Sequence, residues 1–194
     1  VGHVSTFKEG QLYDEIIRIP MLFWWPSTLP AGLVFDDPVQ SIDIMPTLLD
    51  LLSLDAPPRA QGQSLLPLIR SQDNWRPKPL FFETSASGYT ADAADYQKRY
   101  RAMRTRDWKL IHSVTEQQYE LYDLNEDPYE EDNVWEEGTV LSDSLGRMLN
   151  EWAIYAHQVA YRPDMGEDAA VASADTTEEA PVIAFPINGD TLQY

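Results

Sequence analysis

The residues best suited to chemistry gather in the first twenty positions of the sequence. His3 and Lys8 lie there, and Lys8 opens the phrase Lys-Glu-Gly-Gln-Leu-Tyr-Asp-Glu, which is followed by Arg18-Ile19-Pro20. A lysine ammonium can stabilise the charge of an anionic transition state, and a histidine can act as a general acid near neutral pH. Taken alone, such residues are more often a solvated lysine and a structural histidine, so their sequence context must decide.

The acidic residues do not form a convincing metal site. Asp43 and Asp50 lie seven residues apart with hydrophobic spacing, which predicts a helix cap and a solvated helix face. A second acidic cluster comprises Asp123, Asp127, Glu130, Glu131 and Asp132. This cluster lacks the regular alternation and central glycine of a calcium loop, so we predict a turn after a strand. We expect no metal ligand in this sequence.

Histidines and tryptophans further along the chain are predicted to be structural. His112 lies in an expected strand and His157 on an expected helix, where a histidine is more often structural or exposed than a ligand. Trp108, Trp135 and Trp152 are predicted core residues.

Composition excludes several classes of protein. The 14 Lys and Arg residues against 32 Asp and Glu residues give a net charge of -18, which argues against a nucleic-acid partner. Cysteine is absent, so disulfides, thiolate zinc sites and a cysteine-derived nucleophile are excluded from this stretch. No apolar run approaches the roughly 20 residues of a membrane-spanning helix. The sequence opens at Val1 without a signal-peptide pattern and reads as a chain entered midway.

The first part of the chain shows an α/β pattern. A short helix is predicted from Lys8 to Arg18, and the apolar run Ile19–Trp25, closed by Pro26, predicts a strand buried on both faces as in a parallel sheet. A loop over residues 27–38 leads to an amphipathic helix from Ser41 to Leu52.

The second part predicts a separate antiparallel sheet and a long helix. Leu80–Glu83 reads as a short strand, and Arg101–Ser113 with Tyr119–Leu124 reads as an antiparallel pair. Apolar residues keep helical spacing from Leu141 to Tyr161. We therefore predict three regions: residues 1–75 as part of an α/β domain, 76–163 as a smaller subdomain, and 164–194 as an acidic tail.

Four motifs, taken in order, resemble the sulfatase family, an alkaline-phosphatase-like group of hydrolases. They are the Lys8–Glu15 phrase with Arg18-Ile19-Pro20, the helix around Asp43 and Pro46-Thr47-Leu48-Leu49, the segment Gly62-Gln63-Ser64-Leu65, and Arg104–Ile111 with Glu120–Leu124 and Asp127–Asn133. Any one of these motifs could arise by chance, whereas four in the family's order are specific. The resemblance covers residues 1–135 and is to the C-terminal portion of the family.

The resemblance implies a fold, an activity and two site residues. The fold is the C-terminal part of an alkaline-phosphatase-like α/β sandwich plus a small antiparallel-sheet subdomain with a long helix. The activity is hydrolysis of a sulfate ester by a formylglycine nucleophile with a calcium ion, both supplied by the upstream part of the protein. Lys8 corresponds to the active-site lysine that neutralises sulfate charge, and His3 to a residue that contacts the sulfate or protonates the leaving group.

Other residues of the motifs receive supporting roles. Tyr13, Asp14, Glu15 and Arg18 are expected to orient the Lys8 loop, with Arg18 pairing with a carboxylate. In some relatives this sheet borders the substrate pocket, so Arg104 or Arg106 could touch the substrate.

Two alternative functions stay open. The same fold hosts phosphomonoester, phosphodiester and phosphonate hydrolases, and a non-catalytic binding or assembly module could retain a sulfatase remnant. The resemblance implies the N-terminal part of the same sulfatase and a sulfated small molecule or carbohydrate as partners, without a membrane span. It also implies a periplasmic or extracellular location.

Overall fold

The computed structural model describes residues 12–58, 60–72, 75–85 and 99–160. His3, Lys8 and the acidic tail lie outside these ranges. Two compact units divide the chain, Val1–Ala153 and Ile154–Tyr194. The elements that follow belong to the first unit, apart from the end of the last helix. The three regions predicted from the sequence stay a prediction.

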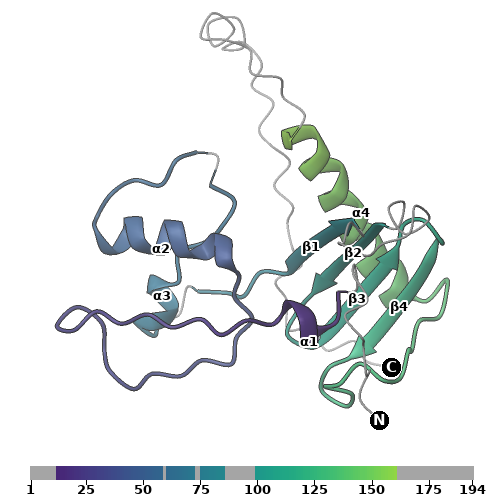
Figure 1. Cartoon of the computed structure of the whole chain (residues 1–194), viewed down its shortest axis with the longest axis horizontal. Coiled ribbons are helices and arrows are strands. Elements are labelled where there is room, and N and C mark those ends of the chain that lie inside the picture. Colours follow the sequence, from purple (N-terminus) through teal and green to yellow (C-terminus); the bar gives the residue numbers. More distant parts are fainter. Residues whose placement is uncertain (1–11, 59, 73–74, 86–98, 161–194) are drawn as a thin grey trace, which may run out of the picture. The chain divides into compact units, whose positions relative to one another are not determined.

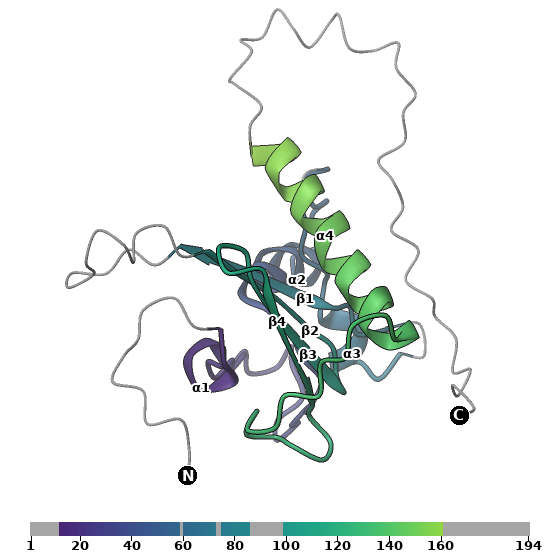
Figure 2. The same cartoon turned by 90° about the vertical axis from the view of Figure 1, so that its right-hand side faces the viewer.

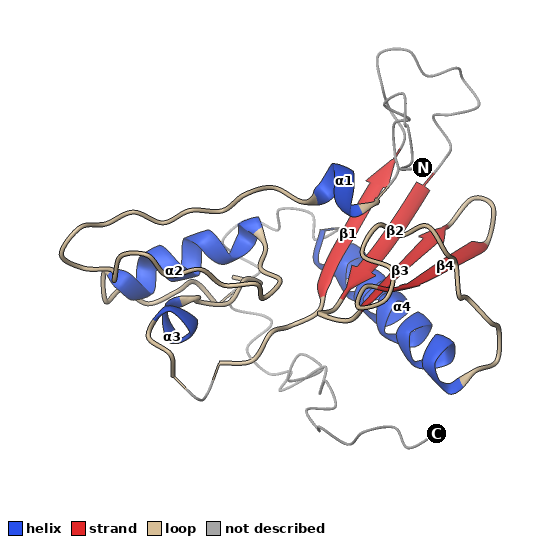
Figure 3. Ribbon diagram, turned by 90° about the horizontal axis from the view of Figure 1, so that it is seen from below, coloured by secondary structure: helices blue, strands red, loops and turns tan. Residues whose placement is uncertain are grey.

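The first unit contains a four-stranded antiparallel sheet (Figures 1 and 3). Its strands are β1 (Leu80–Ser85), β2 (Arg99–Arg104), β3 (Trp108–Ser113) and β4 (Gln118–Asp123), and they pair in sequence order. Each pair is antiparallel, with Arg104 opposite Lys109 and Leu110 opposite Leu121. The predicted antiparallel sheet and its β1 strand are confirmed.

The sequence interpretation of Arg101–Ser113 as one strand is wrong, because a tight turn divides it into β2 and β3. The Thr105 backbone N–H donates to the Trp108 carbonyl at 2.8 Å, and the Trp108 N–H donates to the Thr105 hydroxyl at 2.9 Å. A threonine that bonds locally to the backbone favours such a turn over continued strand.

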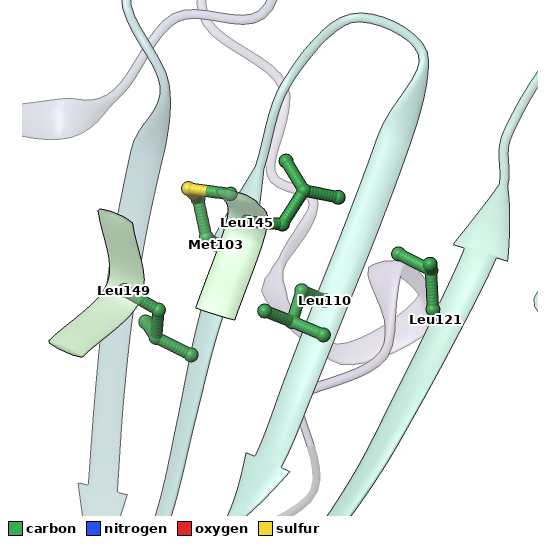
Figure 4. Close-up of a cluster of buried hydrophobic side chains, with 5 residues drawn as sticks. All are labelled: Met103, Leu110, Leu121, Leu145 and Leu149. Carbon is green, nitrogen blue, oxygen red and sulfur yellow. The ribbon is translucent and has the colours of Figure 1, made fainter. Parts of the chain in front are cut away.

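One face of the sheet packs against the long helix α4 (Val140–Ala160). Figure 4 shows the centre of this core, which comprises Met103, Leu110, Leu121, Leu145 and Leu149. The three tryptophans predicted as core residues pack partly buried against it. The ring of Trp152 stacks on Phe81 at 5.0 Å between centroids. The predicted helix is thus confirmed as far as residue 160.

The opposite face of the sheet holds a second apolar cluster. Leu12, Ala102, Ile111 and Tyr122 are buried there, and α1 (Asp14–Ile17) contributes Ile17 at its edge. Because side chains alternate between the two faces of a strand, α1 and α4 lie on opposite sides of the sheet, as Figure 2 shows.

The predicted helix from Ser41 to Leu52 is confirmed as a 3-10 turn, η1 (Ser41–Asp43), followed by α2 (Ile44–Leu51). Asp43 is the predicted cap. Its carboxylate is fully buried and accepts the backbone N–H of Gln40 at 3.0 Å and of Gln63 at 2.8 Å. Asp50 lies on the exposed side and accepts the Ser64 hydroxyl at 2.6 Å.

The Gly62–Leu65 motif lies against the start of this helix. A Cβ atom at Gly62 would be 2.1 Å from the Ile42 carbonyl oxygen, so only glycine fits. The buried Thr47 hydroxyl donates to the Asp43 carbonyl and accepts the Leu65 N–H at 2.9 Å. A short helix, α3 (Leu66–Ile69), follows.

The buried strand predicted for Ile19–Trp25 does not form. These residues are irregular, and Leu22 and Trp24 are 85% and 81% exposed. A strand exists only with a neighbouring backbone to bond, and no described strand pairs with this segment. Of the helix predicted from Lys8 to Arg18, the described part contains Asp14–Ile17 alone.

No helix within the described ranges is long and apolar enough to cross a membrane.

Candidate functional site

Asp14, the first residue of α1, lies at the centre of a network of ion pairs six residues after Lys8. Its Oδ1 accepts the ammonium of Lys109 on β3 at 2.6 Å, and its Oδ2 accepts the Arg104 guanidinium of β2 at 3.0 Å. Arg104 and Lys109 are direct partners across the β2–β3 ladder. Two cations in that position repel each other unless an anion lies between them, and Asp14 is that anion.

Lys109 completes the network from the interior of the protein. Its side chain is fully buried, and its ammonium donates to Glu130 Oε1 at 2.8 Å as well as to Asp14. Glu130 is 2% exposed, and its Oε2 accepts the backbone N–H of Asp14 at 2.9 Å. We call Asp14, Arg104, Lys109 and Glu130 the α1 ion cluster.

A turn after β4 delivers the Glu130 carboxylate to this cluster. Glu130 has a φ of +58°, a left-handed conformation that costs energy for a residue with a side chain. Asp127 holds the turn, because its carboxylate accepts the N–H groups of Glu131 at 3.1 Å and Asp132 at 2.9 Å. The acidic residues after β4 therefore form the predicted turn, and one of them points inward.

Burial and charge act differently on the two carboxyl groups. Burial tends to raise the pKa of Asp14, but the charges and hydrogen bonds of Lys109 and Arg104 outweigh it and hold that pKa below its usual value. At Glu130 burial dominates over the attraction of Lys109, so its pKa is raised. The cluster carries two cations and two carboxyl groups, so its charges balance when both carboxyls are ionised.

A second polar contact fixes the residue before α1. The hydroxyls of Tyr13 and Tyr122 both donate to Glu120 Oε2, each at 2.8 Å. Burial, and then the hydrogen bond and charge of Glu120, raise the pKa of both phenols well above the usual value. Both tyrosines therefore stay protonated and serve as donors at neutral pH.

His112 occupies the opposite face of the sheet. The ring is 5% exposed, stacks on Tyr119 at 4.0 Å between centroids, and neither ring nitrogen has a hydrogen-bond partner among the described residues. Tyr119 in turn stacks on Trp135 at 4.5 Å. Burial, helped by the nearby Arg101 charge, lowers the pKa of His112. His112 is therefore a buried structural histidine, one of the two possibilities, structural or exposed, that the sequence left for it.

The structure separates the residues considered for the site. Arg104 is committed to Asp14 and to the Thr105 carbonyl, whereas Arg106 is 65% exposed with Asp37 at 3.7 Å. The pairing of Arg18 with a carboxylate stays a prediction. No three acidic or histidine side chains in the described part of the chain lie close enough together to hold a metal ion.

Comparison with known proteins assigns this arrangement to a family. A family model described as N-sulphoglucosamine sulphohydrolase, C-terminal, matches residues 2–153. The chain belongs to this sulfatase family. The match covers every residue of the α1 ion cluster, and it confirms the resemblance that the four sequence motifs carry.

Named sulfatases are among the relatives. The N-acetylglucosamine-6-O-sulfatase of Bacteroides thetaiotaomicron is 29% identical over 140 residues, which cover 70% of this chain and 24% of that protein. Human arylsulfatase K is 29% identical over 154 residues, which cover 74% of this chain and 27% of that protein. The chain thus spans about a quarter of the length of these relatives.

Solved structures confirm the α/β fold class of this sulfatase region. The crystal structure of Ps i-CgsB matches with a TM-score of 0.51 and 22% identity, covering 66% of this chain and 27% of that one. The phosphonate monoester hydrolase SpPMH of Silicibacter pomeroyi matches with a TM-score of 0.50 and 22% identity, covering 67% and 27%.

Sequence reasoning missed Lys109, Glu130 and Glu120 as members of the network in this sulfatase region. A usable signal existed for Lys109, because it lies two residues before the apolar Ile111 in an expected strand and therefore shares a face of the sheet with it. A lysine on a buried face requires an acidic partner. The identity of that partner is not a local property of the sequence.

Proposed function

We propose that this chain is the C-terminal part of a sulfuric ester hydrolase. The observation that carries the proposal is the family match over residues 2–153, which includes Lys8 and the whole α1 ion cluster. Relatives that are named sulfatases support it. The chain spans about a quarter of these relatives, and the family resemblance places the formylglycine nucleophile and the calcium ligands in the upstream part of the same protein.

Within this proposal, the chain contributes charge stabilisation and proton transfer. Calcium held by the upstream part would supply Lewis-acid polarisation of the sulfate oxygens. The Lys8 ammonium neutralises charge that develops on the sulfate and on the departing oxygen. His3 contacts the sulfate or gives a proton to the leaving group. The described residues that follow Lys8 take no part in bond making, and in this proposal they help to position Lys8.

The proposed substrate class is a sulfated carbohydrate. Two relatives from Bacteroides thetaiotaomicron are named for sugar sulfates, the N-acetylglucosamine-6-O-sulfatase and a delta 4,5-hexuronate-2-O-sulfatase. The second is 27% identical over 137 residues. Such substrates fit the periplasmic or extracellular location that we propose for the protein.

A second candidate function is hydrolysis of phosphonate or phosphate esters. The fold is shared with the phosphonate monoester hydrolase SpPMH. The two activities make the same demand on Lys8, because both substrates are anionic. The residue at the nucleophile position, which lies outside this chain, separates them.

Peptide mapping and intact mass of the full-length native protein test the proposal first. Formylglycine upstream of Val1, together with faster turnover of sulfate esters than of phosphonate esters, is the expected result. An unmodified serine or threonine at that position with the reverse preference would replace the sulfatase with the second candidate. Absence of turnover on all these esters would refute both proposed hydrolase functions.

Substitution of Lys8 tests the role of this chain within the enzyme. Lys8→Ala is expected to lower kcat by about 10²- to 10³-fold, the usual effect of removing one group that stabilises transition-state charge. Lys78→Ala is the matched control, because Lys78 is an exposed lysine elsewhere in the chain. Equal activity of the two variants would remove Lys8 from the mechanism.

A further inference from the structure

Resting on the proposed function, we propose that Asp14, Lys109 and Glu130 are positioning residues for Lys8, because they fix the described residues that follow it, Leu12–Asp14, to the C-terminal sheet. Lys8 precedes Asp14 by six residues. The three positioning residues come from α1, β3 and the turn after β4. The C-terminal sheet thereby acts on catalysis without touching the substrate.

Asp14 is held at three of its atoms. Its two carboxylate oxygens receive Lys109 at 2.6 Å and Arg104 at 3.0 Å, and its backbone N–H donates to Glu130 at 2.9 Å. One hydrogen bond leaves a residue free to rotate, whereas three bonds in different directions fix both its place and its orientation. The partners lie 90 to 116 residues further along the chain, so the contacts link distant parts of the sequence.

The two residues before Asp14 are also held. Tyr13 donates to Glu120 at 2.8 Å, and Leu12 is 5% exposed in the apolar cluster with Ala102 and Ile111. Three consecutive residues are thus fixed to the sheet. Three residues separate Lys8 from Leu12, and because a residue spans at most about 3.6 Å, the fixed position of Leu12 limits the distance that Lys8 can lie from it.

Simple stability does not require this arrangement. Replacing a buried ion network with apolar residues of similar volume is often neutral or stabilising, and an apolar cluster for holding α1 already exists on the same face. An ion network differs from apolar packing in its dependence on direction and distance. A displacement of about 1 Å can lower the rate of an enzyme by about 100-fold, which makes such precision useful next to a catalytic lysine.

A double-mutant cycle in the full-length enzyme tests the inference. Asp14→Asn keeps the size of the side chain and removes its charge. We expect it to lower kcat by about 10- to 100-fold with KM within about threefold, at a temperature where the variant is folded. In the Lys8→Ala background the same change should lower kcat by less than about twofold, because residues that act through one another are not additive.

Glu83→Gln is the matched control for general effects on the sheet. It removes a 3.2 Å ion pair with Arg101 on the face opposite α1, and kcat should stay within about twofold of the wild-type value. Should Asp14→Asn fail to fold, Glu130→Gln enters the same cycle, because its amide oxygen still accepts the Asp14 N–H. An equal loss of kcat in the wild-type and Lys8→Ala backgrounds would overturn the inference.

Hydrogen exchange separates failure of this inference from failure of the proposed function. A wild-type protein that hydrolyses no sulfate ester refutes the function alone. In that case, faster amide exchange over residues 2–17 in Asp14→Asn than in Glu83→Gln still supports fixation by the cluster. Equal exchange in the two variants overturns it.

Discussion

Removing the Lys109 charge should destabilise the protein in a way that depends on pH. In the wild-type protein the Lys109 ammonium contacts Asp14 at 2.6 Å and Glu130 at 2.8 Å. Lys109→Met replaces it with an apolar side chain of similar length. Asp14 keeps Arg104 at 3.0 Å. Glu130, at 2% exposure, loses its cation while remaining buried, so its carboxylate determines the cost.

Protonation of Glu130 limits that cost. Taking up a proton costs about 1.4 kcal/mol for each pH unit above the ordinary pKa of 4.5, which is about 3.4 kcal/mol at pH 7. This value falls within the roughly 3–5 kcal/mol expected when one partner of a buried ion pair is removed. We therefore expect Lys109→Met to lower the free energy of unfolding by about 3 kcal/mol at pH 7.

The sign of the pH dependence follows from the raised pKa of Glu130. In the variant, folded Glu130 binds a proton at a pH where the unfolded state has lost it, so stability relative to wild type increases as pH falls. From pH 7 to pH 5.5 the deficit should shrink by about 2 kcal/mol. Lys109→Met/Glu130→Gln carries no such carboxyl group, and it should recover most of the loss and show no pH-dependent deficit from this site.

Denaturant unfolding of the full-length protein at several pH values, followed by tryptophan fluorescence, measures these differences. Trp108, Trp135 and Trp152 pack against the core and report on it. A deficit for Lys109→Met below about 1 kcal/mol at pH 7, or one that is the same at pH 5.5, would refute the reasoning, because Glu130 would then not be a buried carboxyl that depends on Lys109.

Two further predictions concern stability alone. His112 has a lowered pKa, so the unfolded state binds more protons below about pH 6.5 and stability falls as pH decreases from there. His112→Phe keeps the stack on Tyr119 and should remove this loss, which amounts to about 1.4 kcal/mol for each pH unit, in unfolding curves at pH 7 and 5.5. The same change of unfolding free energy with pH in wild type and variant would contradict this prediction. Gly62→Ala should destabilise by about 1–3 kcal/mol because its Cβ meets the Ile42 carbonyl, whereas Gly146→Ala in α4 has room and should stabilise by up to about 1 kcal/mol in melting curves. The same sign for both glycine changes would contradict the packing at Gly62.

Hydrophobic periodicity in the sequence predicts several helices and strands correctly. The helical spacing of apolar residues in α2 and α4 and the apolar content of β3 and β4 are visible in the sequence, and these four elements form in the structure. The same method failed at Ile19–Trp25, because an apolar run indicates burial but cannot supply the neighbouring strand that it requires. It also merged β2 with β3, although the polar residues Arg104–Asp107 lie between their apolar residues, because the turn contains neither glycine nor proline to mark it.

The sequence by itself determined the family and the candidate residues, because motif order and residue type are linear properties that survive without coordinates. It placed Asp14 in a motif and Glu130 in an acidic turn, but it did not relate them. Only the tertiary structure decided that these two carboxyls share the buried Lys109, which lies 95 positions after Asp14 in the sequence. The physical reason is that a buried charge must be paired, and which anion reaches it depends on how α1 and the turn after β4 pack on one face of the sheet.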